Sequence, residues 1–348
     1  MYEPKFNYTD KLVSQLIKLE NLKTNIINQD LSYNVKHKLA LNSKALDMFH
    51  LSHIIDLEVS LKEAEKLASG IKLDSIDQKK SYILSNFRNT LEFNRSNIAD
   101  TYSEVDFTIL LHLNKLILTS WRESWDARFR SLSDELNDQE DDWLSLRDHD
   151  INSNKVQNEM ISLVEWYKGA SSKMSSIVRI GILIYRLFEI APYVSGNKIT
   201  ILALADYLLL KNGLSSKIYS SFIRDFDTNE VKYIDAFQLS KKNYDITYWL
   251  ETLVNCLIKE ANEVKDNISL YIVDEEKSKQ QPFLDLNKRQ LKILRYLQTV
   301  PMIKREDYCH MMEVSTMTAF RDLNDLVRKK LIKVEGQGRG TKYRLISM

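Results

Sequence analysis

The sequence predicts an all-α protein that ends in a small α+β domain. Only 8 glycines and 4 prolines occur among 348 residues, and their scarcity favours long helices because turns and strand edges draw on these residue types. Apolar residues also recur with the helical period over most of the chain. The exception is the segment GQGRGTK near the C-terminus, which holds three of the eight glycines and predicts a tight β-hairpin.

The composition is that of an ordinary globular protein, with 44% hydrophobic and 28% charged residues. The most apolar stretch, 177–194, is interrupted by Arg179, Arg186 and Glu189, so it predicts a buried core helix rather than a membrane span. The two cysteines are far apart without metal-site spacing, and the first residues lack the pattern of a signal peptide. We therefore expect a cytoplasmic protein without membrane contact.

Helices are expected along most of the chain. Thr9 is a suitable N-cap for the first helix, Gly70 closes the third and Ser75 caps the fourth. The acidic segment 125–151 has no helical period and predicts a loop, and the polar segment 275–282 predicts a linker. The expected helices are one that starts near 9 and includes 27, then 39–57, 61–67, 75–93, 105–121, one from about 155, 171–190, 200–210 and 245–264.

Charge is distributed unevenly between the expected domains. From residue 287 onward 14 Lys and Arg accompany 6 Asp and Glu, a net charge of +8, although the whole chain carries +1. Such a basic module would be drawn to a polyanion. The expected domains are an N-terminal helical arm at 1–72, a helical core at 73–272, a linker at 273–286 and a C-terminal domain at 287–348.

The C-terminal domain resembles the winged helix-turn-helix of bacterial regulators. Helices are expected at 288–299, 304–312 and 316–330, with a turn at 313–315 and two strands at 331–335 and 343–346. The resemblance implies that the third helix enters the major groove of DNA with its N-terminal end. The alternative is a protein–protein module on the same frame. The candidate DNA-binding residues are Ser315, Thr316, Thr318 and Arg321 on the helix and Arg339 and Lys342 on the wing; Phe320, Leu323 and Leu326 are expected to face inward.

Residues 175–214, SSIVRIGILIYRLFEIAPYVSGNKITILALADYLLLKNGL, are similar to the core of the Fic (Fido) family. That family has a long helix, a loop of consensus His-Pro-Phe-x-Asp/Glu-Gly-Asn-Gly/Lys-Arg and a second helix. The segments KFNYTDKLVSQL, FHLSHIIDLEVSLKEAEKL and YDITYWLETLVNCLIKEANE resemble further family landmarks in the expected order. The resemblance covers essentially the whole chain and implies a Fic-type helical bundle with an N-terminal helical arm.

In the family the motif histidine is the general base, the acidic residue holds Mg²⁺ and the arginine binds nucleotide phosphates, so that a protein side chain is nucleotidylated. This sequence has Ala191, Ser195 and Ile199 at those positions. Loss of a general base alone costs roughly 10²–10⁴-fold in rate, and a neutral serine is a poor ligand for a hard cation. We therefore expect no ordinary Fic catalysis.

The loop could still hold an anion at the start of the following helix. The candidate phosphate-binding residues are Gly196, Asn197, Lys198 and Thr200, with ATP or another nucleotide as ligand. The alternative is a helix–helix connector in which Gly196 makes the turn. Ser52 and Asp56 resemble the family's inhibitory motif, whose glutamate engages the arginine that is Ile199 here.

Two histidines and two arginines are further candidate site residues. His50 and His53 are three apart on a helix and could serve a metal, but Asp56 is the one carboxylate evident beside them, so no metal site is expected. Arg128 and Arg130 resemble a family position beside the active site, or form surface ion pairs.

The sequence thus favours a catalytically degenerate Fic-fold regulator that binds DNA through residues 287–348, with a body for dimerisation, partner docking or phosphate sensing. Two alternatives remain: a nucleotidyltransferase that uses non-consensus residues, and a non-enzymatic partner of an active Fic enzyme.

Overall fold

The computed structural model describes residues 2–96, 105–120, 122, 126–131, 134, 143, 146–170, 174–213, 221–280, 286–297, 300–329, 331–336 and 341–346. The chain forms two compact units, Met1–Ile272 (unit 1) and Val273–Met348 (unit 2). Each unit has its own hydrophobic core. Among the described residues, no helix combines the length and apolar character needed to cross a bilayer.

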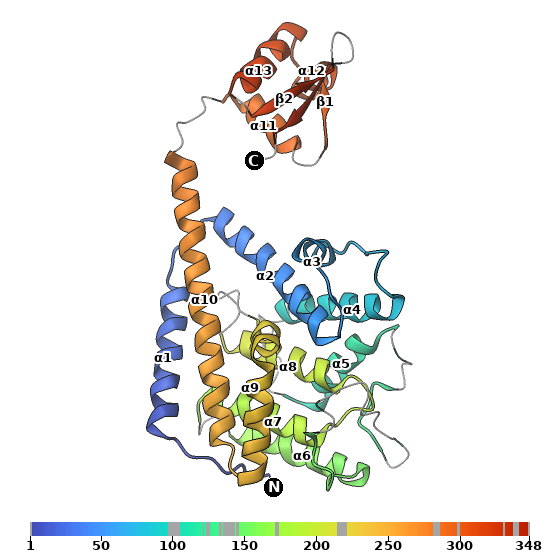
Figure 1. Cartoon of the computed structure of the whole chain (residues 1–348), viewed down its shortest axis with the longest axis vertical. Helices are drawn as coiled ribbons and strands as arrows, with labels where there is room; N and C mark the ends of the chain where they lie inside the picture. The colour runs from blue at the N-terminus through green and yellow to red at the C-terminus, as the bar shows by residue number, and fades with distance from the viewer. Residues whose placement is uncertain are drawn as a thin grey trace. The chain divides into compact units, whose positions relative to one another are not determined.

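Helices make up the regular structure described in unit 1 (Figure 1). As expected, Thr9 caps the first of them: its Oγ1 accepts a hydrogen bond from the Leu12 backbone at 3.1 Å. The helices are α1 Asp10–Ile27, α2 Tyr33–Ile54, α3 Leu61–Ala68, α4 Gln78–Ser96, α5 Phe107–Leu118, α6 Ser153–Gly169, α7 Ser176–Ile190, α8 Asn197–Lys211, α9 Phe222–Asn243 and α10 Thr247–Gln280, which continues into unit 2.

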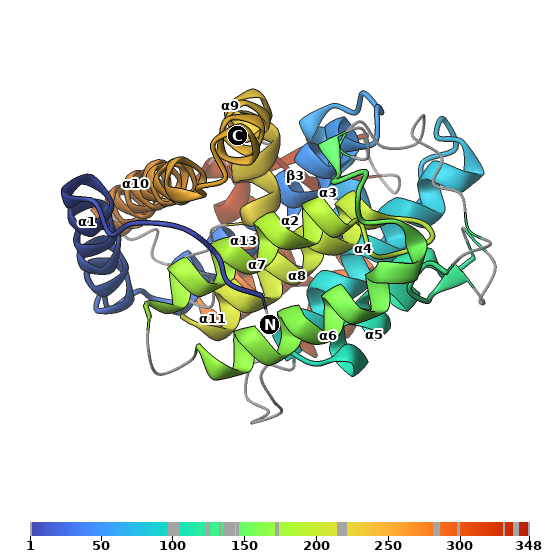
Figure 2. The same cartoon turned by 90° about the horizontal axis from the view of Figure 1, so that it is seen from below.

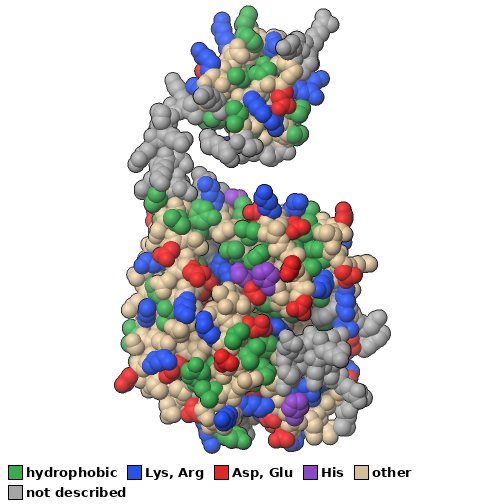
Figure 3. Space-filling model, in the orientation of Figure 1, with side chains coloured by type: hydrophobic (Ala, Val, Ile, Leu, Met, Phe, Trp, Pro, Cys, Tyr) green, Lys and Arg blue, Asp and Glu red, His purple; other side chains and the backbone are tan. Residues whose placement is uncertain are grey.

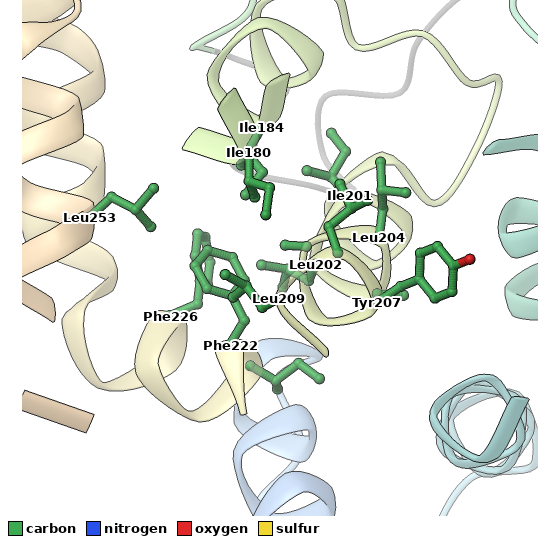
Figure 4. Packing of buried hydrophobic residues seen from close by; sticks show 14 of the residues in the cluster. Ile180, Ile184, Ile201, Leu202, Leu204, Tyr207, Leu209, Phe222, Phe226 and Leu253 are labelled. Atoms are coloured by element: carbon green, nitrogen blue, oxygen red, sulfur yellow. The ribbon is translucent and has the colours of Figure 1, made fainter. Parts of the chain in front are cut away.

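The core of unit 1 is built around α8. Almost every residue of this helix is buried, and it contacts α4, α5, α7 and α9. Figure 2 shows α8 beside α7 within the bundle. In Figure 4, apolar side chains of α7, α8, α9 and α10 point toward one another. Burying each such side chain stabilises the fold by about 1.5–3 kcal/mol relative to leaving it exposed.

Glu251 ties α1 to α10. Its carboxylate accepts a hydrogen bond from Thr9 Oγ1 at 2.6 Å and pairs with Lys11 Nζ at 2.7 Å. Figures 1 and 2 accordingly show α1 lying alongside α10. The N-terminal helix is thus fastened to the body through an element more than 200 residues away in sequence.

Helix α9 is a helix that the sequence pattern did not predict. It bends at Asn229, whose backbone is non-helical with φ −120° and ψ 17°. The Asn229 side chain donates to the Asp225 carbonyl oxygen at 3.1 Å, and Thr228 Oγ1 donates to that of Arg224 at 2.8 Å. Side chains that hydrogen-bond to the carbonyl four residues earlier compete with the helical ladder and bend a helix.

Other boundaries also differ from the sequence expectation. α2 begins earlier, at Tyr33, because Ser32 caps it. α4 begins at Gln78 rather than after Ser75, because the Asp77 carboxylate accepts hydrogen bonds from the first turn. α10 continues to Gln280 and so includes part of the expected linker. The expected loop at 125–151 is described only in part, and no α-helix occurs in that part.

In its described residues, unit 2 contains the end of α10, three short helices and a small sheet. The sheet is antiparallel with strand order β1-β3-β2, and the expected hairpin pairs Ile332 with Leu345 and Glu335 with Lys342. The elements are α11 Lys288–Tyr296, β1 Ile303–Lys304, α12 Arg305–Met312, α13 Thr316–Arg328, β2 Ile332–Glu335 and β3 Lys342–Leu345.

The side chain of Asp322 joins the helices of unit 2. Its carboxylate accepts hydrogen bonds from Asn287 Nδ2 at 2.7 Å, Arg289 Nε at 2.8 Å and the Tyr308 hydroxyl at 2.9 Å. Leu323 and Leu326 face the core as expected, but Phe320 is 41% exposed and its expected inward position is wrong. The Arg305 guanidinium carbon instead lies 5.3 Å from the centre of the Phe320 ring.

Candidate functional site

The loop between α7 and α8, residues 191–196, contains most of the candidate site. α7 ends at Ile190 because Ala191 adopts a left-handed backbone with φ 45°. Arg130, which is 6% exposed, caps this end: its Nε donates to the Ala191 carbonyl oxygen at 2.9 Å and its Nη2 to that of Ile190 at 2.8 Å. A cation at the negative end of a helix is stabilising, so Arg130 acts as a structural cap.

Tyr193 and Asn197 determine the shape of the loop. The Asn197 side chain accepts a hydrogen bond from the Tyr193 backbone nitrogen and donates one to the Tyr193 carbonyl oxygen, both at 2.9 Å. The Tyr193 ring is fully buried, and its hydroxyl donates to the Leu110 carbonyl oxygen at 3.2 Å. Burial raises the pKa of Tyr193 above its ordinary value. The interior of the loop is therefore filled by protein.

The first turn of α8 is held from α5. Gly196 is its N-cap, with φ 72°, and provides no capping side chain. Asn114 Nδ2 donates to the Ser195 carbonyl oxygen and to Thr200 Oγ1, both at 3.0 Å. Because Thr200 is fully buried, its hydroxyl is used inside the protein.

Lys198 is paired with a carboxylate from α9. Its Nζ lies 2.7 Å from Glu230 Oε1, and its side chain is 12% exposed. Trp143 Nε1 donates to the same oxygen at 3.1 Å. A phosphate at the start of α8 would therefore compete with Glu230 for the ammonium group.

The three side chains at the motif positions that the sequence resemblance implies, Ala191, Ser195 and Ile199, include no group for acid–base or metal chemistry. Ala191 is 2% exposed and Ile199 is 7% exposed, so a methyl and a butyl side chain fill buried space there. Ser195 is partly buried and contributes its carbonyl oxygen to Asn114. These side chains include no proton acceptor at neutral pH, no carboxylate and no guanidinium.

The inhibitory-like residues lie on and just after α2. Ser52 is fully buried and its Oγ donates to the Phe49 carbonyl oxygen at 2.6 Å. Asp56 is exposed, with a left-handed backbone at φ 52°, and its carbonyl oxygen accepts from Lys80 Nζ at 2.6 Å. Within the described part of the chain, Asp56 makes no hydrogen bond or ion pair with the α7–α8 loop.

Arg128 makes an ion pair with Asp134. Its Nη1 and Nη2 donate to the two carboxylate oxygens at 2.5 and 2.6 Å. These hydrogen bonds hold the pKa of Asp134 well below its usual range. Of the two arginines singled out from the sequence, Arg128 is thus in an ion pair and Arg130 in a helix cap.

In unit 2 the structure brings the helix candidates together at the start of α13. Ser315 is the N-cap: its Oγ accepts from the Thr318 backbone at 3.3 Å and lies 3.0 Å from Thr318 Oγ1. Thr316 and Arg321 are exposed on this helix, and Lys342 is exposed on β3. Arg339 lies outside the described residues.

Sequence reasoning missed the residues that α9 contributes. Glu230, which pairs with Lys198, and Asp227, which contacts histidines of α2, both come from this helix. A signal was present, since Phe222, Phe226, Tyr233 and Phe237 recur at helical spacing. The charged residues Arg224 and Asp225, which are buried, interrupt this helical pattern of apolar residues.

No family model matches the sequence, and no curated protein matches it. Solved structures do match. A Fic family protein from Desulfovibrio desulfuricans G20 is similar with a TM-score of 0.61 at 14% identity, over 100% of this chain and 99% of that chain.

Two further structures cover about three quarters of the chain. Fic-1 from C. elegans, residues 134–508, gives a TM-score of 0.57 at 15% identity over 77% of this chain and 73% of that one. A Fic domain containing signaling protein from Bacteroides thetaiotaomicron VPI-5482 gives 0.56 at 16% identity, over 75% and 98%. The chain therefore has a Fic-like fold with a small C-terminal antiparallel sheet among helices, and the fold class expected from the sequence is confirmed.

Proposed function

We propose that the protein is a DNA-binding regulator in which unit 2 is a winged helix and unit 1 is a Fic-like body without transferase chemistry. The observation that carries the proposal is the uncompensated positive charge of unit 2. Of the six carboxylates from residue 287 onward, three form ion pairs within the unit: Asp322 with Arg289, Asp325 with Arg328 and Lys329, and Glu335 with Lys333 and Arg344.

Several basic side chains of unit 2 have no carboxylate partner among the residues that the structure describes. They are Lys288, Lys292, Arg295, Lys304, Arg305, Arg321 and Lys342. Backbone phosphates of a nucleic acid are the polyanion that such a surface attracts.

The start of α13 supports duplex DNA as the ligand. This helix follows α12 after a short turn at 313–315, and its outer face exposes Thr316, Met317, Arg321 and Asn324. An α-helix fits the major groove of DNA, where short polar side chains at its N-terminal end meet base edges and phosphates. Arg321 and Lys342 supply phosphate contacts in this proposal.

For unit 1 the proposal is a non-catalytic role in dimerisation, partner docking or phosphate sensing. The absence of a base, a carboxylate and a guanidinium at Ala191, Ser195 and Ile199 supports it. The proposed compartment is the cytoplasm, where the free thiols of Cys256 and Cys309 stay reduced.

Binding of the full chain to random-sequence duplex DNA tests the proposal. At about 50 mM salt a mobility shift is expected, and affinity should fall steeply as salt rises. The double variant Arg321→Ala, Lys342→Ala should reduce the slope of log affinity against log salt by about 1.8, which corresponds to two phosphate contacts. Lys62→Ala, which removes an exposed charge from unit 1, is the control. No shift at about 50 mM salt would remove the DNA proposal.

Labelled ATP with Mg²⁺ tests the rival transferase. Lys198 at the start of α8 is the group that favours this rival, because a cation at a helix N-terminus suits a phosphate. Its ion pair with Glu230 opposes it. We expect no transfer of label to the protein or to lysate proteins. Transfer that Lys198→Ala abolishes would establish the enzyme instead.

A further inference from the structure

Three side chains of metal-ligand type converge outside the α7–α8 loop. His50 and His53 on α2 both direct Nδ1 at Asp227 Oδ2 on α9, at 2.7 and 3.2 Å. One ligand atom of each residue lies within 4.8 Å of the others. In Figure 3, histidine side chains (purple) meet acidic ones (red) near the middle of the visible face of unit 1.

The packing of α2 against α9 creates this convergence. Residues three apart lie on the same side of a helix, so His50 and His53 both face α9. The Phe49 ring contacts both imidazoles, with ring centres 5.3 and 4.4 Å apart, and so restricts their rotation. Asp227 immediately precedes the bend of α9 at Asn229.

The electrostatics of the cluster favour a cation. Within the described part of the chain, the Asp227 carboxylate contacts these two imidazoles and pairs with no lysine or arginine. Its side chain is only 16% exposed. Buried carboxylates in proteins are paired or coordinate metal ions, and a cation bound here would compensate this one.

We propose that His50, His53 and Asp227 form a binding site for a divalent transition-metal ion of the Zn²⁺ type. Two imidazole nitrogens and one carboxylate oxygen are donors that suit zinc and its neighbours better than Mg²⁺ or Ca²⁺. Ligand atoms around tetrahedral zinc are roughly 3.4 Å apart for bond lengths near 2.1 Å. The two imidazole nitrogens lie 2.7 and 3.2 Å from the Asp227 oxygen. Side-chain shifts of about an ångström would bring the three ligand atoms to the spacing of a tetrahedral site.

The proposed ion would cross-link two helices that are 177 residues apart in sequence at Asp227 and His50. His53 is the more open ligand, with 38% of its side chain exposed, so an ion could enter from that side. Glu230, the partner of Lys198, follows Asp227 by three residues on α9, so the ion would also hold in place the segment that contacts the first turn of α8. All three proposed ligands belong to unit 1.

Zinc binding by the full, tag-free chain tests the proposal. After chelator treatment, Zn²⁺ is titrated in competition with a chromophoric chelator, and thermal unfolding of unit 1 is followed by circular dichroism. We expect one equivalent of Zn²⁺ and a rise in melting temperature that depends on Zn²⁺ concentration, because an ion that binds only the folded state stabilises it. Co²⁺ should give visible absorption bands at the same stoichiometry.

Matched variants separate this site from other ligands such as Cys309. Asp227→Asn and His53→Gln should each lower the affinity for Zn²⁺ by at least about tenfold, since loss of a residue that only supports a ligand already lowers metal affinity 10–100-fold. Asp235→Asn, on the same helix but exposed, and His112→Gln should bind as the parent does. Equal Zn²⁺ affinity in the parent and Asp227→Asn would overturn the proposal, and so would absence of any Zn²⁺-dependent rise in melting temperature.

Discussion

Unit 1 should become less stable as pH rises from about 5.5 to 7.5, because two buried carboxyl groups are protonated in the folded state. Asp206 on α8 and Asp225 on α9 are 3% and 2% exposed. Burial raises the pKa of each from 3.8 to about 7. In the unfolded chain both groups release their protons near pH 4. Between these values the folded state binds more protons, so the free energy of unfolding falls with increasing pH.

The surroundings of Asp206 and Asp225 explain why their pKa values are raised. The charge of Asp47 raises the pKa of Asp206 further, and Arg95 only partly offsets it. Asp225 accepts a hydrogen bond from the Tyr233 hydroxyl, which lowers its pKa by less than burial raises it. One group that titrates fully contributes about 1.4 kcal/mol per pH unit. Two such groups give a slope of up to about 3 kcal/mol per pH unit within this window.

Urea unfolding followed by circular dichroism at pH 5.5, 6.5 and 7.5 measures this slope. Asp225→Asn removes one titrating group while keeping an acceptor for Tyr233, so it should reduce the slope by about half. Asp235→Asn removes an exposed carboxylate from the same helix and should leave the slope unchanged. Stability that increases with pH over this range, or equal slopes in the parent and Asp225→Asn, would refute the reasoning.

Three further substitutions probe the packing. Asn197→Ala should destabilise unit 1 by about 2–3 kcal/mol in urea, because two hydrogen bonds to the Tyr193 backbone are lost; a loss below about 0.5 kcal/mol would mean that other contacts hold the loop. Gly181→Val should cost about 1–3 kcal/mol by overpacking, since a Cβ there would lie 2.7 Å from Leu253 Cδ2, and an unchanged melting temperature would contradict this. Asp322→Ala should destabilise unit 2 by about 2–3 kcal/mol, because hydrogen bonds from Asn287, Arg289 and the buried Tyr308 hydroxyl are lost; hydrogen exchange should show lost protection in unit 2 alone, and an equal loss of protection in both units would contradict it.

Boundaries encoded by local hydrogen bonds were the most predictable part of the fold. Thr9 caps α1 because its hydroxyl reaches a backbone N–H three residues later. Gly70 ends α3 in a left-handed conformation, with φ 84°, as a glycine there predicts. Such interactions depend on a few neighbouring residues and can be read without the rest of the chain.

The sequence pattern did not predict α9 because this helix buries charged residues, and only tertiary contacts make that burial favourable. Arg224 and Asp225 interrupt the apolar pattern, yet they are 7% and 2% exposed. Arg224 is buried because Glu260 of α10 pairs with it, and Asp225 because Tyr233 hydrogen-bonds to it. Charged residues are rarely buried without partners, and those partners become evident only once the helices are packed.

The candidate loop shows the same division. The sequence alone establishes that Ala191, Ser195 and Ile199 cannot supply a base, a carboxylate or a guanidinium. It could not establish that Glu230 neutralises Lys198, or that the Tyr193 ring occupies the loop interior. Both depend on elements brought from elsewhere in the fold.

By itself, then, the sequence determined the helical class, the basic character of the C-terminal segment and the unreactive side chains of Ala191, Ser195 and Ile199, because composition, periodicity and residue identity are properties of short segments. The tertiary structure alone decided which charges are paired and which ligands meet. Asp227 reaches His50 across 177 residues of chain, and only the packing of α2 on α9 places an acidic oxygen within 2.7 Å of an imidazole nitrogen.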